Sequence, residues 1–316
     1  YQAGSEMNDA NSTPGLDFGL VGYWPFDGNA SDFSGNGNHG TVQGATLGTD
    51  RHGNANMAYS FDGVNDHIQA SNNDGSLSLN SKFTISAWVN LVGSGSSTLL
   101  SKTRIGNGSE NDDNYRIGTS NETKLTFKIE NASNDEDFGV SSNSTSAIAE
   151  WYQVIASYDE SVLSMSVDGN LVSSRVIGKV IPYTGSGPLQ LGSNSLSNHA
   201  IRRLTGLLDD VRIYDRALSS SEVLALYNLE KPKAALTNAN FQDAVNLWFT
   251  DEANATATYG HIRDWNVSAV TDMSEAFKDR STFNEDISGW DVSAVTNFGQ
   301  IFFNASAFNQ PIGDWN

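Results

Sequence analysis

The sequence LVGYWPFDGN at residues 20–29 and the sequence LLDDVRIYDRALS at residues 207–219 decide the fold. Each is an apolar, aromatic strand pattern with an aspartate at a strand end, Asp27 in the first and Asp210 in the second. A buried strand rarely carries a carboxylate, because burying an unpaired charge costs free energy. We therefore expect the first and last strands of one domain to lie side by side, with a cation shared between the two aspartates.

Strands with one buried face fill the sequence between these two segments. Apolar and polar residues alternate at 83–91, 125–129 and 163–167, and this period of two is typical of such strands. Turn sequences rich in Gly, Asp and Asn separate them. Short strands with regular turns predict an all-β sandwich or jelly roll over residues 16–230. One helix is expected at its end, where Ser219 and Glu222 form a capping box ahead of apolar residues at helical spacing.

A repeat follows this domain. The sequence DWNVSAVT at residues 264–271 recurs as GWDVSAVT at residues 289–296. Trp265, Trp290 and Trp315 recur at the same constant interval, and two pairs of phenylalanines keep it too. A period in the twenties is typical of leucine-rich-repeat-like solenoids, in which each unit buries its apolar face by stacking on its neighbour.

These patterns define three parts of the chain. Residues 1–15 are polar and aperiodic, so we expect a leader or linker there. Residues 231–316 are expected to form the repeat region, with a helical cap at 238–250 and repeats from about residue 264. Because the sequence stops within a repeat, we expect the natural chain to continue beyond Asn316.

The composition limits the possible partners. Of the 316 residues, 37 are Asp or Glu and 18 are Lys or Arg, so the net charge is −19. Such a chain repels nucleic-acid phosphates and attracts cations. It has no cysteine, which excludes disulfides and thiolate metal sites. No apolar run approaches the roughly 20 residues of a membrane helix, so we expect neither nucleic-acid binding nor membrane insertion.

Several motifs together resemble known families. Residues 17–230 are similar to the LamG-type, concanavalin A-like jelly-roll domain through the sequences GYWPFDG, DFSGNGNHGT, FDGVNDHI, FTISAWV and VDG and the segment 207–227. Residues 234–316 resemble BspA-type surface-protein repeats through the elements Trp-x-Val-Ser-x-Val-Thr and Phe-Asn-x-x-Ile. The resemblance implies a concanavalin A-like jelly-roll sandwich followed by a BspA-type solenoid segment, in a secreted or cell-surface protein of bacterial origin.

The resemblance also implies a structural Ca²⁺ site. Asp27 and Asp210 match the carboxylates of the family's calcium, which takes roughly six to eight oxygen ligands. In the alternative interpretation, Asp27 only makes the Asp-Gly turn, and Asp210 pairs with Arg212 or Arg216. The predicted ligand set is Asp27, Asn29, Asn38 and Asp210.

Sugar recognition requires an aromatic ring with polar side chains beside it. Two acidic stretches, 110–114 and 134–137, are further candidates, although charged runs are commonly solvated loop tips. The candidate ligand contacts are side chains of the required types in or near predicted loops: Arg104, Tyr115, Arg116, His199 and Arg202.

Enzymatic activity is not expected. Hydrolases that share this fold use a Glu-x-Asp-x-x-Glu strand with its carboxylates on one face, and the sequence has no such strand. The histidines show no zinc-binding spacing. We therefore predict a non-catalytic, Ca²⁺-stabilised extracellular module that binds a glycan or a cell-surface ligand in adhesion. The alternatives are a structural subunit of an extracellular fibre or sheath, which has other protein subunits as partners, and the binding region of a larger polysaccharide-degrading enzyme.

Overall fold

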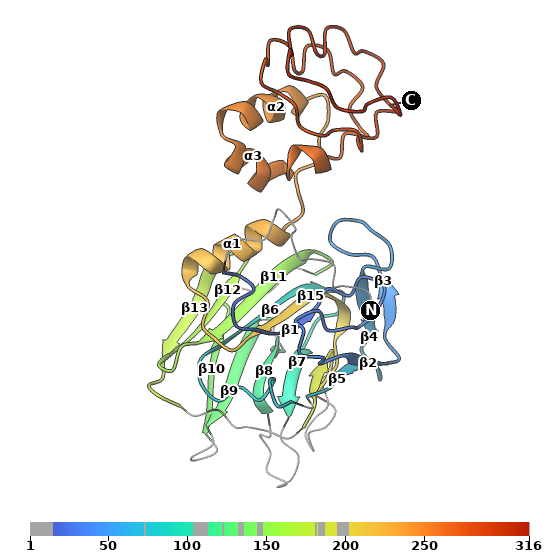
Figure 1. Cartoon of the computed structure of the whole chain (residues 1–316). Coiled ribbons are helices and arrows are strands. Elements are labelled where there is room, and N and C mark those ends of the chain that lie inside the picture. Colours follow the sequence, from blue (N-terminus) through green and yellow to red (C-terminus); the bar gives the residue numbers. More distant parts are fainter. Residues whose placement is uncertain are drawn as a thin grey trace. The chain divides into compact units, whose positions relative to one another are not determined.

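The chain forms two compact units, residues Tyr1–Lys231 and Pro232–Asn316, here called the sandwich unit and the repeat unit (Figure 1). Each is described by itself. The structure is a computed structural model that describes residues 15–72, 74–103, 113–121, 123–131, 136–143, 148–180, 182, 187–194 and 202–315.

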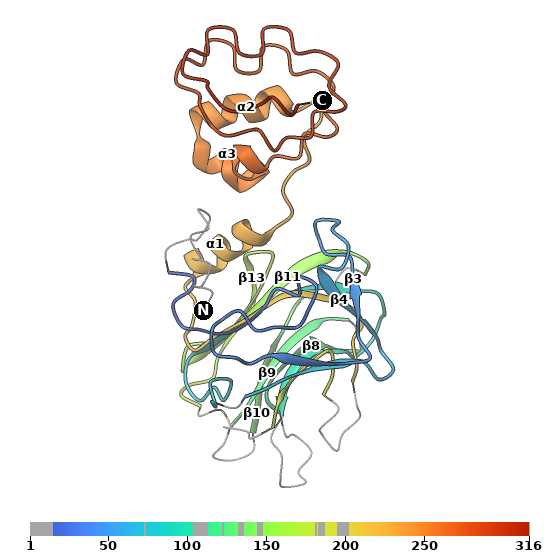
Figure 2. The ribbon, with the colours of Figure 1, turned by 45° about the vertical axis from the view of Figure 1, so that its right-hand side comes forward.

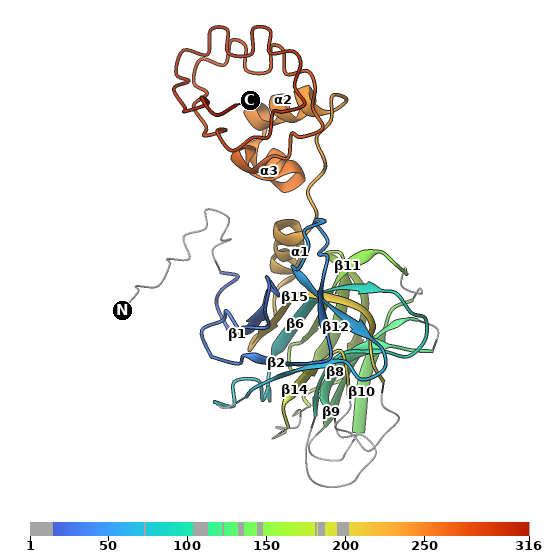
Figure 3. The same cartoon turned by 90° about the vertical axis from the view of Figure 1, so that its right-hand side faces the viewer.

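The sandwich unit consists of two antiparallel sheets that pack face to face (Figures 1 and 3). The first sheet follows the order β13 (Asn170–Val176), β12 (Val162–Val167), β11 (Trp151–Tyr158), β6 (Phe83–Leu91), β15 (Thr205–Tyr214), β4 (Ala58–Asp62) and β3 (Thr46–Gly48), and β1 (Leu20–Trp24) also pairs with β15. The second sheet follows the order β10 (Glu136–Ser141), β9 (Leu125–Asn131), β8 (Asp113–Thr119), β7 (Thr98–Thr103), β14 (Leu189–Leu191), β5 (His67–Ala70) and β2 (Gly40–Gln43).

The segments at residues 20–29 and 207–219 lie side by side. β1 pairs with β15 in antiparallel register, so that Trp24 lies opposite Val211. The alternating segments of the sequence correspond to β6, β9 and β12. The predicted all-β sandwich of antiparallel strands is therefore confirmed.

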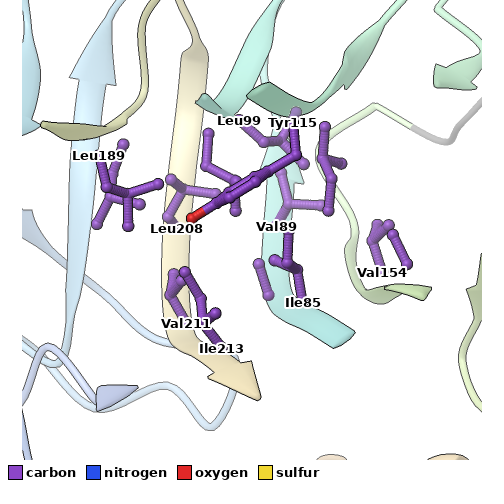
Figure 4. Packing of buried hydrophobic residues seen from close by; sticks show 14 of the residues in the cluster. Ile85, Val89, Leu99, Tyr115, Val154, Leu189, Leu208, Val211 and Ile213 are labelled. Carbon is purple, nitrogen blue, oxygen red and sulfur yellow. The ribbon is translucent and has the colours of Figure 1, made fainter. Parts of the chain in front are cut away.

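The core lies between the sheets. Figure 4 shows Tyr115 of the second sheet extending toward Val89 and Leu208 of the first sheet. All three side chains are buried in one apolar cluster, and the Tyr115 hydroxyl donates to the carbonyl of Leu77 at 3.1 Å. Burial of the alternating apolar residues of both sheets supplies the main stabilisation of such a sandwich.

Helix α1 (Ser220–Glu230) packs on the first sheet, on the face away from this core. Its N-terminus is the predicted capping box, in which Ser219 and Glu222 satisfy each other's backbone N–H groups. Val223 and Leu226 pack against Ile155 of β11 in a second apolar cluster. The helix therefore covers a sheet face that would otherwise be open.

The repeat unit begins with α2 (Phe241–Thr250), α3 (Glu252–Tyr259) and the short 3-10 helix η1 (Ile262–Asp264). The chain then makes successive coils, here called the first coil (residues 266–290) and the last coil (residues 291–315), which run side by side in Figure 2. Equivalent rings of these coils stack nearly parallel. The ring centroids of Trp290 and Trp315 are 6.2 Å apart, and the ring planes differ by 4°. In the described part of the chain, no helix has the length and apolar character needed to cross a membrane.

Candidate functional site

The predicted cation site lies where β1 meets β15. Asp27 follows β1, and its pKa is raised by its partial burial and by the nearby charge of Asp210. Asp210 occupies a β-bulge of β15, where the pairing with β6 shifts between Asp209 and Arg212. Its φ of 43° is left-handed, which is uncommon outside glycine. The two predicted aspartates are thus close enough for the charge of Asp210 to raise the pKa of Asp27.

The bulge directs two consecutive carboxylates to one guanidinium. Neighbouring side chains of a regular strand point to opposite faces, and a bulge changes that alternation. Arg51, from the loop between β3 and β4, binds the carboxylates of both Asp209 and Asp210, the latter at 2.6 Å. The same guanidinium lies 4.8 Å from the centre of the Trp88 ring. The guanidinium of Arg51 is therefore the cation paired with Asp210, one of the two aspartates predicted to share a bound metal ion.

The network continues into the end of α1. Arg51 also donates through its Nε to the backbone carbonyl of Glu230 at 2.6 Å. The buried carboxylate of Glu230 accepts hydrogen bonds from Trp88 at 2.8 Å, from Gln153 at 2.7 Å and from Arg212 at 2.5 Å. These contacts tie α1 to the first sheet by charge-assisted hydrogen bonds, which are stronger than neutral ones.

The buried cluster holds more negative than positive charge. Its two guanidinium groups, Arg51 and Arg212, face three carboxylates, those of Asp209, Asp210 and Glu230. Burial, with the neighbouring charge of Asp210, raises the pKa of Asp209 to about 8, although Arg51 opposes this change. Burial likewise raises the pKa of Glu230 against the effect of Arg212. A proton on one of the three carboxyl groups would balance the two guanidinium charges.

The raised pKa of Asp209 makes stability depend on pH. Because the pKa of Asp209 is higher in the folded chain than its unfolded value of about 3.9, the folded state binds more protons between about pH 4 and pH 8. The contribution of Asp209 to stability is fully present below the unfolded pKa and is lost as the pH rises through this window. We expect urea unfolding to show this decline for the natural chain and a flatter profile for Asp209→Asn. Parallel profiles for the two chains would show that Asp209 does not carry the effect.

The described donors do not fit a Ca²⁺ ion bridging Asp27 and Asp210. One oxygen of Asp210 accepts the Tyr23 hydroxyl at 2.7 Å and the other accepts Arg51. The side-chain oxygen of Asn29 accepts the N–H of Ser31 at 2.8 Å. Among the described residues, no group of three or more His, Cys, Asp or Glu side chains could hold a metal ion.

Two predicted ligands keep oxygens for a further partner among the described residues, since Asp27 is exposed and the Oδ1 of Asn38 is buried without a hydrogen bond. Its amide nitrogen is already used, donating to the carbonyl of Val21 at 2.9 Å and to Ser76 at 2.8 Å. These oxygens are fewer than the roughly six ligands that Ca²⁺ requires. Of the predicted alternatives, Asp210 does approach Arg212, but at 3.8 Å, and its close partner is Arg51, which the sequence argument missed.

Calcium itself stays a prediction that a melting experiment can test. Because Arg51 neutralises the carboxylates of Asp209 and Asp210, we expect EDTA to leave the melting temperature of the sandwich unit unchanged. Calcium added afterwards should also have no effect. A melting temperature that falls in EDTA and recovers with Ca²⁺ would reinstate the bridging ion, because a ligand bound only to the folded state stabilises that state.

The predicted ligand contacts are dispersed. Tyr115 is fully buried in the core, so its ring is closed to any ligand and this prediction is wrong. Arg116 is half-buried on β8, and the N–H of Arg202 donates to the side chain of Asn194 at 2.6 Å. Arg104 and His199 lie outside the described residues, as do most residues of the two acidic stretches.

A polar pocket of about 550 Å³ opens at one end of the second sheet. It lies where the turn before β9 meets the end of β10, and two hydrogen bonds are found among these segments. The Ser120 N–H donates to the carbonyl of Lys124 at 2.8 Å, and the Leu125 N–H donates to the hydroxyl of Ser142 at 3.0 Å. The pocket is lined by Ser120, Asn121, Lys124, Ser141, Ser142 and Asn143. The sequence argument missed it, because its lining residues resemble ordinary turn residues.

Comparison with known families agrees with the geometry of the two sheets. A model described as the concanavalin A-like lectin/glucanases superfamily matches residues 62–224, just over half of the chain. The chain belongs to this superfamily. Within this concanavalin A-like chain, residues 234–316 match a second family, described as Mycoplasma protein of unknown function, DUF285. No curated protein shows significant similarity to the sequence.

Similar solved structures share the fold at low identity. The binding domain of Paraclostridial Mosquitocidal Protein 1 is 17% identical with a TM-score of 0.55. The match covers 70% of this chain and 54% of that one. The receptor binding domain of the botulinum neurotoxin C/D mosaic serotype is 14% identical with a TM-score of 0.56, covering 72% and 59%. A botulinum neurotoxin type C structure is 13% identical with a TM-score of 0.56, covering 72% and 55%. The concanavalin A-like chain thus spans less than two thirds of these structures.

Proposed function

We propose that the sandwich unit is a non-catalytic module that binds a glycan on a cell surface. The observation that carries the proposal is the polar pocket beside β9 and β10, lined by hydroxyl, amide and ammonium groups. Its volume of about 550 Å³ falls in the roughly 300–1,000 Å³ range of ligand sites. Hydroxyl and amide groups donate and accept hydrogen bonds at once, as the hydroxyls of a sugar require.

The comparisons support a binding role rather than a reaction. Two of the similar structures are binding domains of toxins. The botulinum neurotoxin type C structure concerns cell entry that depends on interaction with two ganglioside molecules. We carry over from these proteins only the class of ligand, a glycan at a cell surface, because fold alone does not fix function.

We also propose that the module acts outside the cell, and that the repeat unit is a BspA-like solenoid that carries it. The stacking of equivalent tryptophans from successive repeats supports the solenoid. A fibre subunit and a region of a larger polysaccharide-degrading enzyme remain the alternatives. A concentration series in the ultracentrifuge separates the fibre from the monomeric module, because only the fibre subunit assembles.

The pocket can be tested with a glycan array and one pair of variants. Lys124→Ala removes the ammonium group of the pocket, and we expect it to weaken the best array ligand about ten- to hundredfold, since a hydrogen bond to a charged group contributes about 1.5–3 kcal/mol. Lys179→Ala makes the same change at an exposed position outside the pocket and should bind as the natural chain does. Equal losses in the two variants would place the site elsewhere. If no glycan on the array binds, the proposal of a glycan ligand is wrong.

A further inference from the structure

The pocket beside β9 and β10 differs in charge from the chain that contains it. Asp and Glu outnumber Lys and Arg in the chain by 37 to 18. Among the described residues that line the pocket, however, none carries a carboxylate, and Lys124 carries an ammonium. The lining of the pocket is therefore positive in a chain whose net charge is −19.

The hydrogen bonds of the lining residues leave donors beside this charge. The side-chain oxygen of Asn121 accepts the hydroxyl of Ser96 at 2.6 Å, so its amide nitrogen, with two N–H groups, remains as a donor. The ammonium of Lys124 only donates. The side-chain nitrogen of Asn143 donates to the carbonyl of Val172 at 3.5 Å, which leaves its oxygen as an acceptor. A carboxylate fits the first two groups, because it only accepts hydrogen bonds and carries the opposite charge.

Further cations lie on the same face of the second sheet. Alternate residues of β9 are buried in the core, so Thr126 and Lys128 between them lie on its outer face. Ser141, which lines the pocket, is opposite Thr126, and Arg116 is opposite Lys128. A strand rises about 3.4 Å per residue, which puts Lys128 about 7 Å beyond the level of the pocket.

Along β9 and β10, the described carboxylates of this face are those of Glu130 and Asp137. They lie opposite each other, two residues beyond Lys128 and so about 14 Å from the level of Thr126. Glu130 is buried, and Asp137 pairs with Lys128 at 3.5 Å. The Debye length is about 8 Å at physiological ionic strength, so both charges are largely screened at the pocket. They oppose the attraction of Lys124 for an anion only weakly.

We propose that the pocket binds the carboxylate of an acidic sugar, a uronic acid or a sialic acid within a glycan. This inference rests on the proposed glycan-binding function and names its class of ligand. Lys124 pairs with the carboxylate and Asn121 donates to it, while Asn143 accepts a hydroxyl of the same sugar. Hydrogen bonds to an ionised group are about twice as strong as neutral ones, so the acidic group decides which glycan binds.

The test compares acidic glycans with their uncharged methyl esters. Trigalacturonic acid supplies the uronic acid and sialyllactose the sialic acid, and each ester keeps the sugar while removing its charge. We expect one of the two acids to bind the full chain about tenfold or more tightly than its ester in titration calorimetry. The acid that does so identifies the kind of sugar. Added salt should reduce the difference, because it screens the ion pair.

The outcomes separate this inference from the proposed function. If acid and ester bind equally, or if only neutral glycans of the array bind, the carboxylate is not recognised and the inference is wrong, although the chain still binds a glycan. If neither these probes nor any glycan of the array binds, the proposed function is wrong as well.

Variants at Lys124 assign the preference to the pocket. Lys124→Gln removes the charge and keeps hydrogen-bonding groups, so it should lose the preference for the acid while binding the ester as the natural chain does. Lys124→Arg keeps the charge and should keep the preference. Lys179→Gln makes the first change at an exposed position outside the pocket and should have no effect. A preference that persists in Lys124→Gln would place the carboxylate elsewhere and overturn the inference.

Discussion

Replacing Arg51 with alanine should lower the free energy of unfolding of the sandwich unit by about 3–5 kcal/mol, the cost of breaking a buried ion pair by removing one partner. The guanidinium holds the carboxylates of Asp209 and Asp210 and the carbonyl of Glu230. Without it, two adjacent carboxylates remain buried at a bulge, and Asp210 keeps only the looser contact with Arg212 at 3.8 Å among the described residues. Urea unfolding followed by circular dichroism and tryptophan fluorescence measures the loss.

Two comparisons make this prediction specific. Lys128→Ala breaks a partly exposed pair with Asp137 at 3.5 Å, and exposed pairs contribute only about 0–1 kcal/mol. The triple change Arg51→Met, Asp209→Asn, Asp210→Asn removes the two negative charges together with the cation. It should recover much of the lost free energy of unfolding, since uncharged replacements of a buried ion pair are commonly tolerated. A loss from Arg51→Ala no larger than that from Lys128→Ala would show that the carboxylates are solvated in the folded chain.

The sequence predicted the framework of this site but not its chemistry. Asp27 and Asp210 stood out because carboxylates are rare in apolar strands, and the pairing of β1 with β15 does bring their segments together. Arg51 carried no comparable signal, since one arginine in a polar loop has many possible partners. The bulge at Asp210 was also hidden, because a left-handed φ is a signal only where glycine occupies the position.

Tyr115 shows a signal that was present and was not used. It alternates with Ile117 along β8, and both side chains are buried in the core. Applied to this segment, the period-two argument that located the other strands places Tyr115 inside the sandwich. The prediction that Tyr115 lies in or near a loop neglected this periodicity.

The repeat was the clearest prediction, because its constant interval is seen in the sequence without knowledge of the fold. In the structure, rings one repeat apart stack on each other. The ring centroids of Phe277 and Phe302 are 5.6 Å apart with 7° between the ring planes, and those of Phe283 and Phe308 are 5.6 Å apart with 1° between the planes. The sequence could not show how the backbones of the coils pair, with Glu275 donating to Gly299 in one direction and Thr296 donating to Thr271 in the other. The coils also turn through left-handed residues such as Glu275 and Gln300, which the sequence does not reveal.

Phe277→Ala should be the most damaging single change in the repeat unit, with an expected loss of about 3–5 kcal/mol for a fully buried phenylalanine. Its ring lies 4.1 Å from that of Phe283 and 5.6 Å from that of Phe302, and it also contacts Phe249 of α2. Alanine would leave a cavity between the helical cap and both coils. Since each coil is held by its neighbours, we expect the last coil to lose protection together with the first.

A matched variant separates stacking from the mere loss of an aromatic side chain. Phe303→Ala removes a ring that is 53% exposed on the last coil, and surface changes of this kind are usually within about 0.5 kcal/mol. Hydrogen exchange across residues 232–315 should show faster exchange in both coils for Phe277→Ala and little change for Phe303→Ala. Faster exchange confined to the first coil would mean that the last coil is stable without its neighbour, contrary to the stacked arrangement of rings and hydrogen bonds.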